Sequence, residues 1–142
     1  ISAQKKTESF MGSDMSYEDM TKRKLDEYTY FLKKSEIINN VEYYVLESVC
    51  GDYKTEYSRH LSWITKNTYL IIKENSYDKK GQLLKSKSIN YNRIKDYYIM
   101  DEMFVKNIQR NHTTLLKFTN IEVDSGIDEN IFHEKNLKRI PR

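Results

Sequence analysis

The chain has 142 residues, with 24 Lys and Arg against 21 Asp and Glu, so its formal net charge is only +3. This length favours a single domain. Leu, Ile, Val and Phe together make 34 residues, roughly 24% of the chain, above the ~20% below which disorder is expected. Twelve Tyr accompany a single Ala. Because Ala is the strongest helix former and Tyr favours strands, a helical bundle is excluded.

The chain begins at Ile1 without a basic and apolar leader, and we expect it to be a fragment or a processed product. Its only cysteine, Cys50, excludes an internal disulfide. No stretch approaches the ~20 apolar residues of a membrane-spanning helix.

A capping box marks the first expected element. Residues 1–15 are irregular, and Ser16-Tyr17-Glu18-Asp19 resembles a helix N-terminus with Asp at the position that Glu or Gln usually fills. This pattern predicts a short helix over about 17–24.

From residue 28 the apolar residues recur with a period of two, which is typical of strands. Tyr28, Tyr30 and Leu32 alternate with Thr29, Phe31 and Lys33, and Asn39-Asn40 leads into a second alternating run over 41–50. Two such runs joined by a two-residue turn predict a β-hairpin.

The same pattern continues to the end of the chain. Further strands are expected near 60–65, 69–72, 83–91, 97–108 and 113–123, and Asp78-Lys79-Lys80-Gly81 is expected to close a hairpin. A second cap at 125–128 predicts a short turn of helix through Phe132. Seven strands joined largely by hairpins predict a mainly β fold, a curved antiparallel sheet or incomplete barrel with short helices.

Several strands carry apolar residues on both faces, for example Tyr43 and Val45 against Tyr44 and Leu46. A sheet with one solvated face would show cleaner alternation. Either another part of the structure covers the second face, or that face binds an apolar ligand.

Five segments, taken in order, resemble one family. They are Phe10-Met11-Gly12-Ser13-Asp14-Met15-Ser16-Tyr17-Glu18-Asp19-Met20, Tyr43-Tyr44-Val45-Leu46-Glu47, Trp63-Ile64 with Lys66-Asn67, Tyr77-Asp78-Lys79-Lys80-Gly81, and Ile131-Phe132 with Leu137-Lys138-Arg139. Together they resemble the outer-membrane lipoprotein-sorting proteins, the LolA-like family, over nearly all of residues 9–139.

The resemblance implies a half-open barrel around helices, with a hydrophobic cavity for acyl chains. It also implies that residues 1–142 form one LolA-like domain without its N-terminal part, namely the signal peptide, the first helix and the first strands. The implied function is non-catalytic periplasmic carriage of lipoprotein acyl chains or another lipid, beside an inner-membrane permease. Burying an acyl chain would gain roughly 0.8 kcal/mol per CH₂.

Nine residues are candidates for contact with lipid, because they alternate within the expected strands and are aromatic, branched or flexible. These are Tyr43, Val45, Leu61, Trp63, Leu70, Ile72, Ile89, Tyr91 and Met103. The alternative is that they form the core against helices of the family fold.

The residues give no positive support for catalysis. His60, His112 and His133 lack the spacing of a zinc site, and Cys50 is expected to be a half-buried structural residue. There is no GxSxG motif and no Gly-rich phosphate loop. We therefore predict no enzyme activity, no metal and no cofactor.

Two other kinds of partner remain open. A basic hairpin, with Lys79, Lys80, Lys85, Lys87, Arg93 and Lys95, would suit nucleic acid. Interleaved acidic residues argue against that partner, and exposed strand lysines also prevent edge-to-edge aggregation. The stronger alternative is a β-rich protein-interaction module without lipid cargo, and an exposed sheet edge would allow homodimers.

Overall fold

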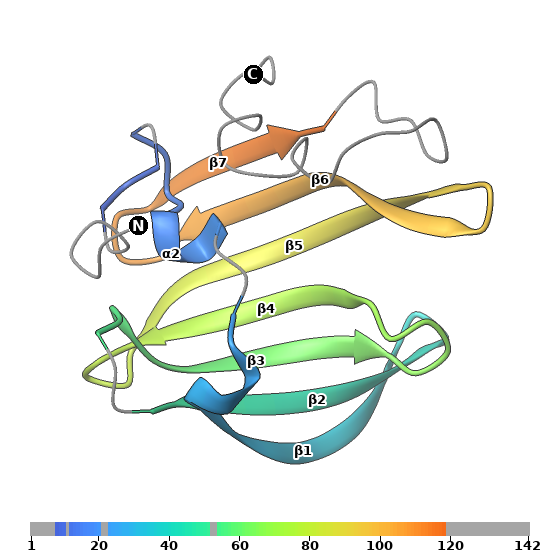
Figure 1. Ribbon diagram of the computed structural model, residues 1–142, viewed down its shortest axis with the longest axis horizontal. Coiled ribbons are helices and arrows are strands. Elements are labelled where there is room, and N and C mark those ends of the chain that lie inside the picture. The colour runs from blue at the N-terminus through green and yellow to red at the C-terminus, as the bar shows by residue number, and fades with distance from the viewer. Residues whose placement is uncertain (1–7, 11, 21–22, 52–53, 119–142) are drawn as a thin grey trace.

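A computed structural model describes residues 8–10, 12–20, 23–51 and 54–118. It contains a seven-stranded antiparallel sheet in which each strand pairs with the next along the chain (Figure 1). The strands are β1 (Tyr28–Ile38), β2 (Val41–Cys50), β3 (Tyr57–Thr65), β4 (Ile71–Asp78), β5 (Leu83–Ile94), β6 (Tyr97–Asn107) and β7 (His112–Lys117). The predicted mainly β, antiparallel fold is confirmed, and the sheet is open, with β1 and β7 at its two edges.

The predicted hairpin turns are present. Asn39 and Asn40 both have positive φ, 50° and 65°, as a two-residue type I′ turn requires. Gly81 has a φ of 82°, and the Asp78 carboxylate accepts hydrogen bonds from the backbone N–H groups of Lys80 and Gln82. These turns fix the register of β1 with β2 and of β4 with β5.

The expected capping box is also present. The Asp19 carboxylate accepts from the Ser16 backbone N–H at 2.8 Å, and the Ser16 hydroxyl accepts from the Asp19 N–H at 3.3 Å. The helix it begins, α2 (Tyr17–Met20), is a single turn, and the 3-10 turn η1 (Leu25–Glu27) precedes β1. The short predicted helix is therefore confirmed at its start, but its predicted end near residue 24 is wrong, because Lys24 has an extended backbone.

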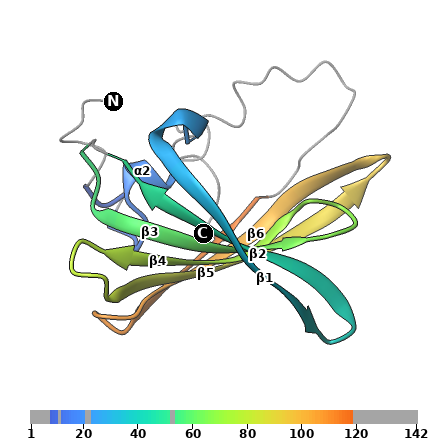
Figure 2. The same cartoon turned by 90° about the horizontal axis from the view of Figure 1, so that it is seen from below.

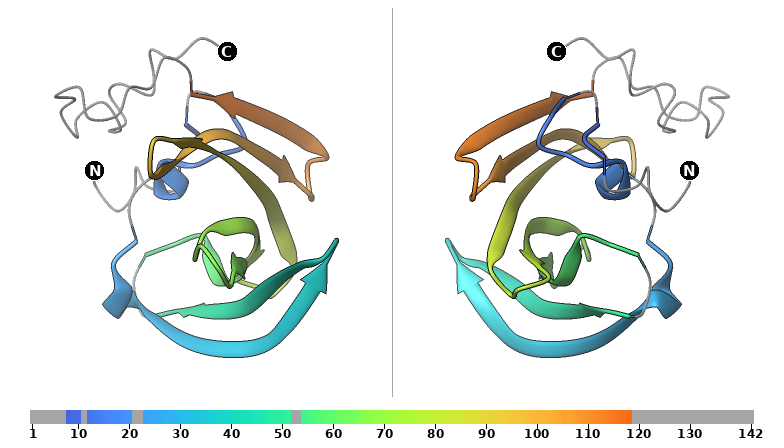
Figure 3. Two further views of the ribbon diagram at one scale, coloured as in Figure 1. Left: turned by 90° about the vertical axis from the view of Figure 1, so that its right-hand side faces the viewer. Right: turned by 90° about the vertical axis from the view of Figure 1, so that its left-hand side faces the viewer.

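The N-terminal segment covers one face of the sheet. Phe10 and Met15 are fully buried and join Ile89, Met103 and Val105 in the hydrophobic core. Figure 2 shows α2 on one side of the sheet, and Figure 3 shows it beside the half formed by β5, β6 and β7. On this face, the covering structure that the two-sided apolar pattern requires is the chain's own N-terminal segment.

A buried carboxylate ties the same segment to the last strand. Asp14 accepts from the Thr114 hydroxyl at 2.7 Å, and its oxygens lie 2.8 Å from His112 Nδ1. Thr114 in turn accepts from the Asp14 backbone N–H at 3.0 Å. These contacts hold the N-terminal segment against β7 although 100 residues separate Asp14 from Thr114 in the chain.

The sequence predicts elements at the end of the chain beyond those that the structure describes. The strand expected near 113–123 is β7, His112–Lys117. The second cap at 125–128, the helical turn through 132 and the basic segment 137–139 lie outside the described residues. Within the described part, no helix has the length and apolar character needed to traverse a bilayer.

The Asn39-Asn40 turn provides a test of the register. Asn40→Val should lower the free energy of unfolding by about 1–2 kcal/mol, because a β-branched side chain is strained in the left-handed region. Asn67→Val in the β3–β4 connection is the control. Asn67 is not among the positive-φ residues, so its change should stay within about 0.5 kcal/mol. Equal losses in urea titrations of the two variants would contradict the type I′ assignment.

Candidate functional site

The strand register defines two faces of the sheet. The covered face carries Lys87, Ile89 and Val105, on which the N-terminal segment packs. The outer face carries Val45, which pairs with Trp63, and Lys73, which also pairs with Trp63. Directly paired residues in antiparallel strands project to the same side of a sheet. This rule assigns each predicted site residue to one face.

The nine candidate residues do not share a face. Tyr43, Val45, Leu61 and Trp63 belong to the outer face, whereas Ile89, Tyr91 and Met103 belong to the core of the covered face. The remaining two, Leu70 and Ile72, lie at the start of β4, Leu70 immediately before it. A single surface containing all nine residues is therefore not present.

An apolar pocket of about 290 Å³ gathers four of the nine. Tyr43, Trp63, Ile72 and Ile89 line it together with Ile38, Lys73, Ser88 and Asn90. Small-molecule sites are typically about 300–1,000 Å³ and predominantly apolar, so this pocket lies just below the small end of that range. Its size suits part of one chain-like apolar group.

Polar contacts hold the Trp63 indole at the pocket. Its Nε1–H donates to the Glu36 carboxylate at 3.2 Å, and the Lys73 ammonium lies 4.7 Å from the ring centre. Lys34 forms a 3.3 Å ion pair with the same carboxylate. The hydrogen bond from Trp63, followed by that from Lys34, lowers the pKa of Glu36. The indole is thus fixed between an anion and a cation.

A buried ionic network occupies the covered face beside the hydrophobic core. The Glu74 carboxylate accepts from Arg23 at 2.9 Å and from the Ser62 hydroxyl at 2.8 Å, and it lies 3.4 Å from the Lys87 ammonium. Glu74 is 3% exposed and Lys87 is 5% exposed. These charges are removed from water, so each one depends on its partner.

A second part of this network centres on Lys85. Its ammonium donates to Asp19 at 2.8 Å and to Glu56 at 3.0 Å. The Tyr57 hydroxyl also donates to Asp19, at 2.6 Å. Asp19 therefore caps α2 with one set of contacts and neutralises a buried lysine of β5 with another.

Burial of Lys85 and Lys87 corrects the expectation that strand lysines are exposed. They are 4% and 5% exposed, because Glu74 pairs across the sheet with Lys87 and Asp19 reaches Lys85 from α2. One signal in the sequence points to this burial. Both lysines alternate in phase with Ile89 and Tyr91, so they share a face with core residues. The period alone does not give the identity of their partners.

The network displaces the pKa values of its members. Burial raises the pKa of Asp19, but Lys87 and Lys85 outweigh this effect and lower the pKa to about 2. Burial lowers the pKa of His60 to about 3, and the nearby Arg23 adds to this effect. Burial also opposes ionisation of Glu74, yet Lys87 and Arg23 bring its pKa well below the usual range. At neutral pH the carboxylates are charged and His60 is neutral.

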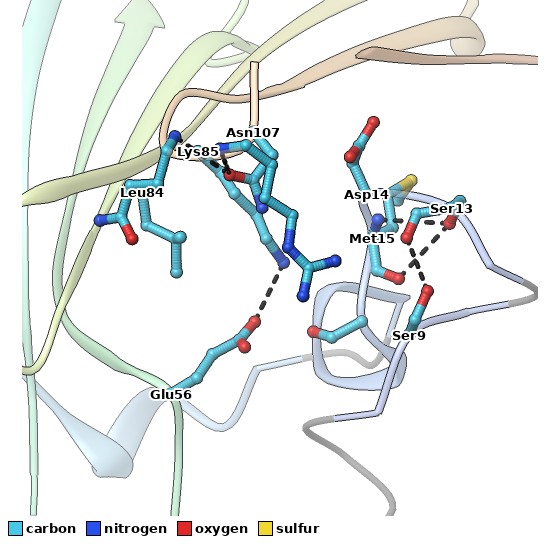
Figure 4. Close-up of a pocket in the computed structure, with 11 residues that line it drawn as sticks. Ser9, Ser13, Asp14, Met15, Glu56, Leu84, Lys85 and Asn107 are labelled. Atoms are coloured by element: carbon cyan, nitrogen blue, oxygen red, sulfur yellow. Dashed lines mark hydrogen bonds and ion pairs between the residues drawn. The ribbon is translucent and has the colours of Figure 1, made fainter. Parts of the chain in front are cut away.

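A polar cavity of about 290 Å³ lies at the edge of this network (Figure 4). Ser9, Ser13 and Asp14 line one side, and Glu56 and Lys85 meet across the other. Hydroxyl and charged groups of this kind do not suit an acyl chain. Across residues 8–10, 12–20, 23–51 and 54–118, no three His, Cys, Asp or Glu side chains are grouped to hold a metal ion.

The architecture defines a class: an open antiparallel sheet with a covering N-terminal segment and an apolar pocket. A family model described as "Uncharacterized protein" matches residues 1–139. The chain belongs to the family that this model describes, and its similarity to an outer membrane lipoprotein-sorting domain confirms the LolA-like resemblance that five of its segments indicate. A comparison with curated proteins gives no match.

Solved structures share the fold. A domain described as that of an outer membrane lipoprotein-sorting protein from Vibrio parahaemolyticus is 33% identical, with a TM-score of 0.83, over 98% of this chain and 60% of that chain. A DUF1329 family protein from Desulfovibrio piger is 31% identical, with a TM-score of 0.80, over 96% and 58% of the two chains.

A LolA superfamily protein from Nitrosomonas europaea is 19% identical over 89% of this chain and 58% of that one, with a TM-score of 0.72. That likeness concerns the fold alone. The chain spans about 60% of the length of the solved structures it matches.

The depressed pKa values predict a fold that acid destabilises. Stability is complete above the unfolded-state pKa of His60, near 6.5, and falls as the pH decreases toward its folded value of about 3. Asp19 adds a further loss between its ordinary pKa of 3.8 and about 2, and this shift corresponds to roughly 2–3 kcal/mol. Urea titrations from pH 7 to pH 3 should show this decline.

The His60→Asn variant should flatten the decline between pH 6.5 and pH 4. Lys79→Gln is the control, because Lys79 is an exposed residue of the β4–β5 turn, outside the buried network. A native protein equally stable at pH 7 and pH 4, or a slope unaffected by His60→Asn, would contradict the buried neutral histidine.

Proposed function

We propose that this protein is a non-catalytic lipid carrier that holds part of an acyl chain in the apolar pocket at Trp63. The observation that carries the proposal is the pocket itself, where Tyr43, Trp63 and Ile72 line one cavity with Ile38. The period-two pattern of the sequence predicts three of these residues, all except Ile38, as contacts with lipid. Ile89 is a fourth candidate that lines the pocket, and the other candidates, among them Val45 and Leu61, would support the pocket wall rather than form it.

The physical basis of carriage is burial of hydrocarbon without a covalent bond. Each CH₂ removed from water contributes roughly 0.8 kcal/mol. A cavity of about 290 Å³ shelters only a part of one chain, so binding is moderate and reversible. Cargo is then released to a partner that competes for the same chain, and no catalytic group is needed.

The proposed setting is the periplasm, with lipoproteins or another lipid as cargo and an inner-membrane permease as partner. It rests on the LolA-like resemblance and on the Vibrio parahaemolyticus domain, which is described as that of an outer membrane lipoprotein-sorting protein. Burial of Lys85 and Lys87 in ion pairs also removes two cations from the basic hairpin that nucleic acid would require.

Acyl binding can be tested with a fluorescent long-chain fatty acid. Ile72→Asn should weaken binding by at least about tenfold, because it places an amide against the hydrocarbon. Trp63→Ala should also weaken fatty-acid binding, because it removes the largest side chain that lines the pocket. Phe104→Ala is the control, since Phe104 is an exposed aromatic residue of the sheet that does not line the pocket.

Circular dichroism establishes that each variant retains the fold. Saturable binding by the native chain and the Phe104 variant, with loss in the two pocket variants, supports the proposal. Absence of saturable binding by the native protein, or equal binding by all variants, rejects carriage in this pocket.

The edge strand β1 favours a second candidate function, a β-rich protein-interaction module. Its Tyr30, Phe31 and Leu32 are 41%, 48% and 62% exposed, and one side of the strand has no neighbour within the described sheet. Unpaired strand edges are templates for pairing with another chain. A homodimer through β1 is the simplest form of this interaction.

Sedimentation analysis tests the β1 interface. The native chain should self-associate, and Phe31→Lys with Leu32→Lys should yield monomers because charges at an edge oppose strand pairing. Leu115→Lys, at the opposite edge in β7, is the matched control and should leave the dimer intact. A native chain that remains monomeric at high concentration would reject this second candidate.

A further inference from the structure

The two ends of the sheet differ in character. In a meander, successive turns fall alternately at opposite ends, so the β1–β2, β3–β4 and β5–β6 turns share the right-hand end in Figure 1. Exposed large apolar residues gather there, and we call this set the aromatic end: Ile37, Ile38, Val41, Tyr69, Tyr97 and Tyr98. At the opposite end, where η1 and the other three turns lie, Ile108 and Leu25 are the exposed large apolar residues among the described residues of these segments.

Exposure at the aromatic end is substantial. Ile37 is 68% exposed, Tyr69 is 72% exposed and Tyr97 is 50% exposed. Tyr69 also has a φ of 56°, in a region that a bulky residue rarely adopts. Exposure of this kind, from three separate turns at one end, indicates a surface for contact.

The β5–β6 hairpin projects beyond its neighbours. Pairing of β4 with β5 ends at Ser88, and pairing of β6 with β7 ends at Glu102. The hairpin from Tyr91 to Met100 therefore pairs only with itself, and Figure 1 shows it extending past the other strands. A two-stranded hairpin with Tyr97 and Tyr98 near its tip can reach a flat surface before the rest of the sheet.

Cations accompany the tyrosines at this end. Arg93 lies 5.9 Å from the centre of the Tyr98 ring and 3.7 Å from the exposed carboxylate of Asp96. Lys66 lies 5.0 Å from the centre of the Tyr44 ring and 3.8 Å from the exposed carboxylate of Glu42. Tyrosine rings with their hydroxyl groups prefer the headgroup level of a bilayer, and nearby Lys and Arg favour anionic lipid phosphates.

We propose that the aromatic end docks on the surface of an anionic phospholipid bilayer. The apolar pocket adjoins this end, because Ile38 precedes the β1–β2 turn and Ile72 follows the β3–β4 turn. Docking would therefore place the pocket next to the source of an acyl chain. The docking proposal rests on the proposed carrier function, but vesicle binding can be measured separately from fatty-acid binding.

Vesicle flotation tests the docking. The native chain is mixed with vesicles of phosphatidylcholine alone or of equal parts phosphatidylcholine and phosphatidylglycerol. It should float with the second kind and only weakly with the first. The variant Tyr69→Ser/Tyr97→Ser/Tyr98→Ser should lose about tenfold or more of its vesicle affinity, with an unchanged circular dichroism spectrum.

The matched control lies at the other end of the sheet. Lys79→Gln/Lys80→Gln removes two cations from the β4–β5 turn and should bind vesicles within about twofold of the native chain. If this variant loses as much binding as the tyrosine variant, attraction by charge alone explains the result and the docking proposal fails. The proposal also fails if the tyrosine variant floats like the native chain.

A second copy of the chain is the competing occupant of the aromatic end. If the tyrosine variant changes a dimer to a monomer in sedimentation while vesicles bind neither form, the surface is a self-association site and the proposal is overturned. The fatty-acid titration separates this experiment from the carrier function. Ile72→Asn should still float while losing the probe, whereas the tyrosine variant should keep the probe in vesicle-free solution.

Discussion

The structure depends on charge neutralisation beneath the N-terminal segment. Lys85 and Lys87 point from β5 into the covered face, where an unpaired ammonium would be very unfavourable. Asp19 and Glu74 supply the opposite charges at 2.8 Å and 3.4 Å. Because Asp19 belongs to α2, its ion pair with Lys85 also attaches the N-terminal segment to the sheet, whereas the pair of Glu74 with Lys87 joins β4 to β5. Phe10 and Met15 then complete the core.

This arrangement explains how a chain with few aliphatic residues builds a stable core. The buried hydrophobic set is small, and polar residues take up the remaining interior: Ser48, Ser62, Ser76, His60 and Glu74 are all buried. Buried ion pairs contribute less to stability than well-packed apolar groups, but removing one partner is costly. Each buried charge in this core therefore requires its particular partner. Because polar residues fill part of the interior, apolar side chains remain on the outer face.

The apolar pocket lies next to the aromatic end of the sheet, so one end of the molecule differs from the other. One end of the sheet presents tyrosine and isoleucine, and the other presents fewer exposed apolar residues. Under the proposed function, the molecule would approach a membrane with its pocket foremost. The charged covered face would then serve as the rigid support that keeps the hairpins in place.

Local signals in the sequence determined much of the fold. The alternation of Tyr28, Tyr30 and Leu32, the Asn39-Asn40 turn and the Ser16–Asp19 capping box each act within a few residues, so their structures follow from neighbouring side chains. The family resemblance and the seven-stranded antiparallel order followed from the same short segments. Only the tertiary structure decided which face is covered, since period two defines two faces without saying which one meets the N-terminal segment. Burial of Lys85 and the division of the nine candidate residues between faces depend on contacts between distant segments, which one strand's pattern cannot specify.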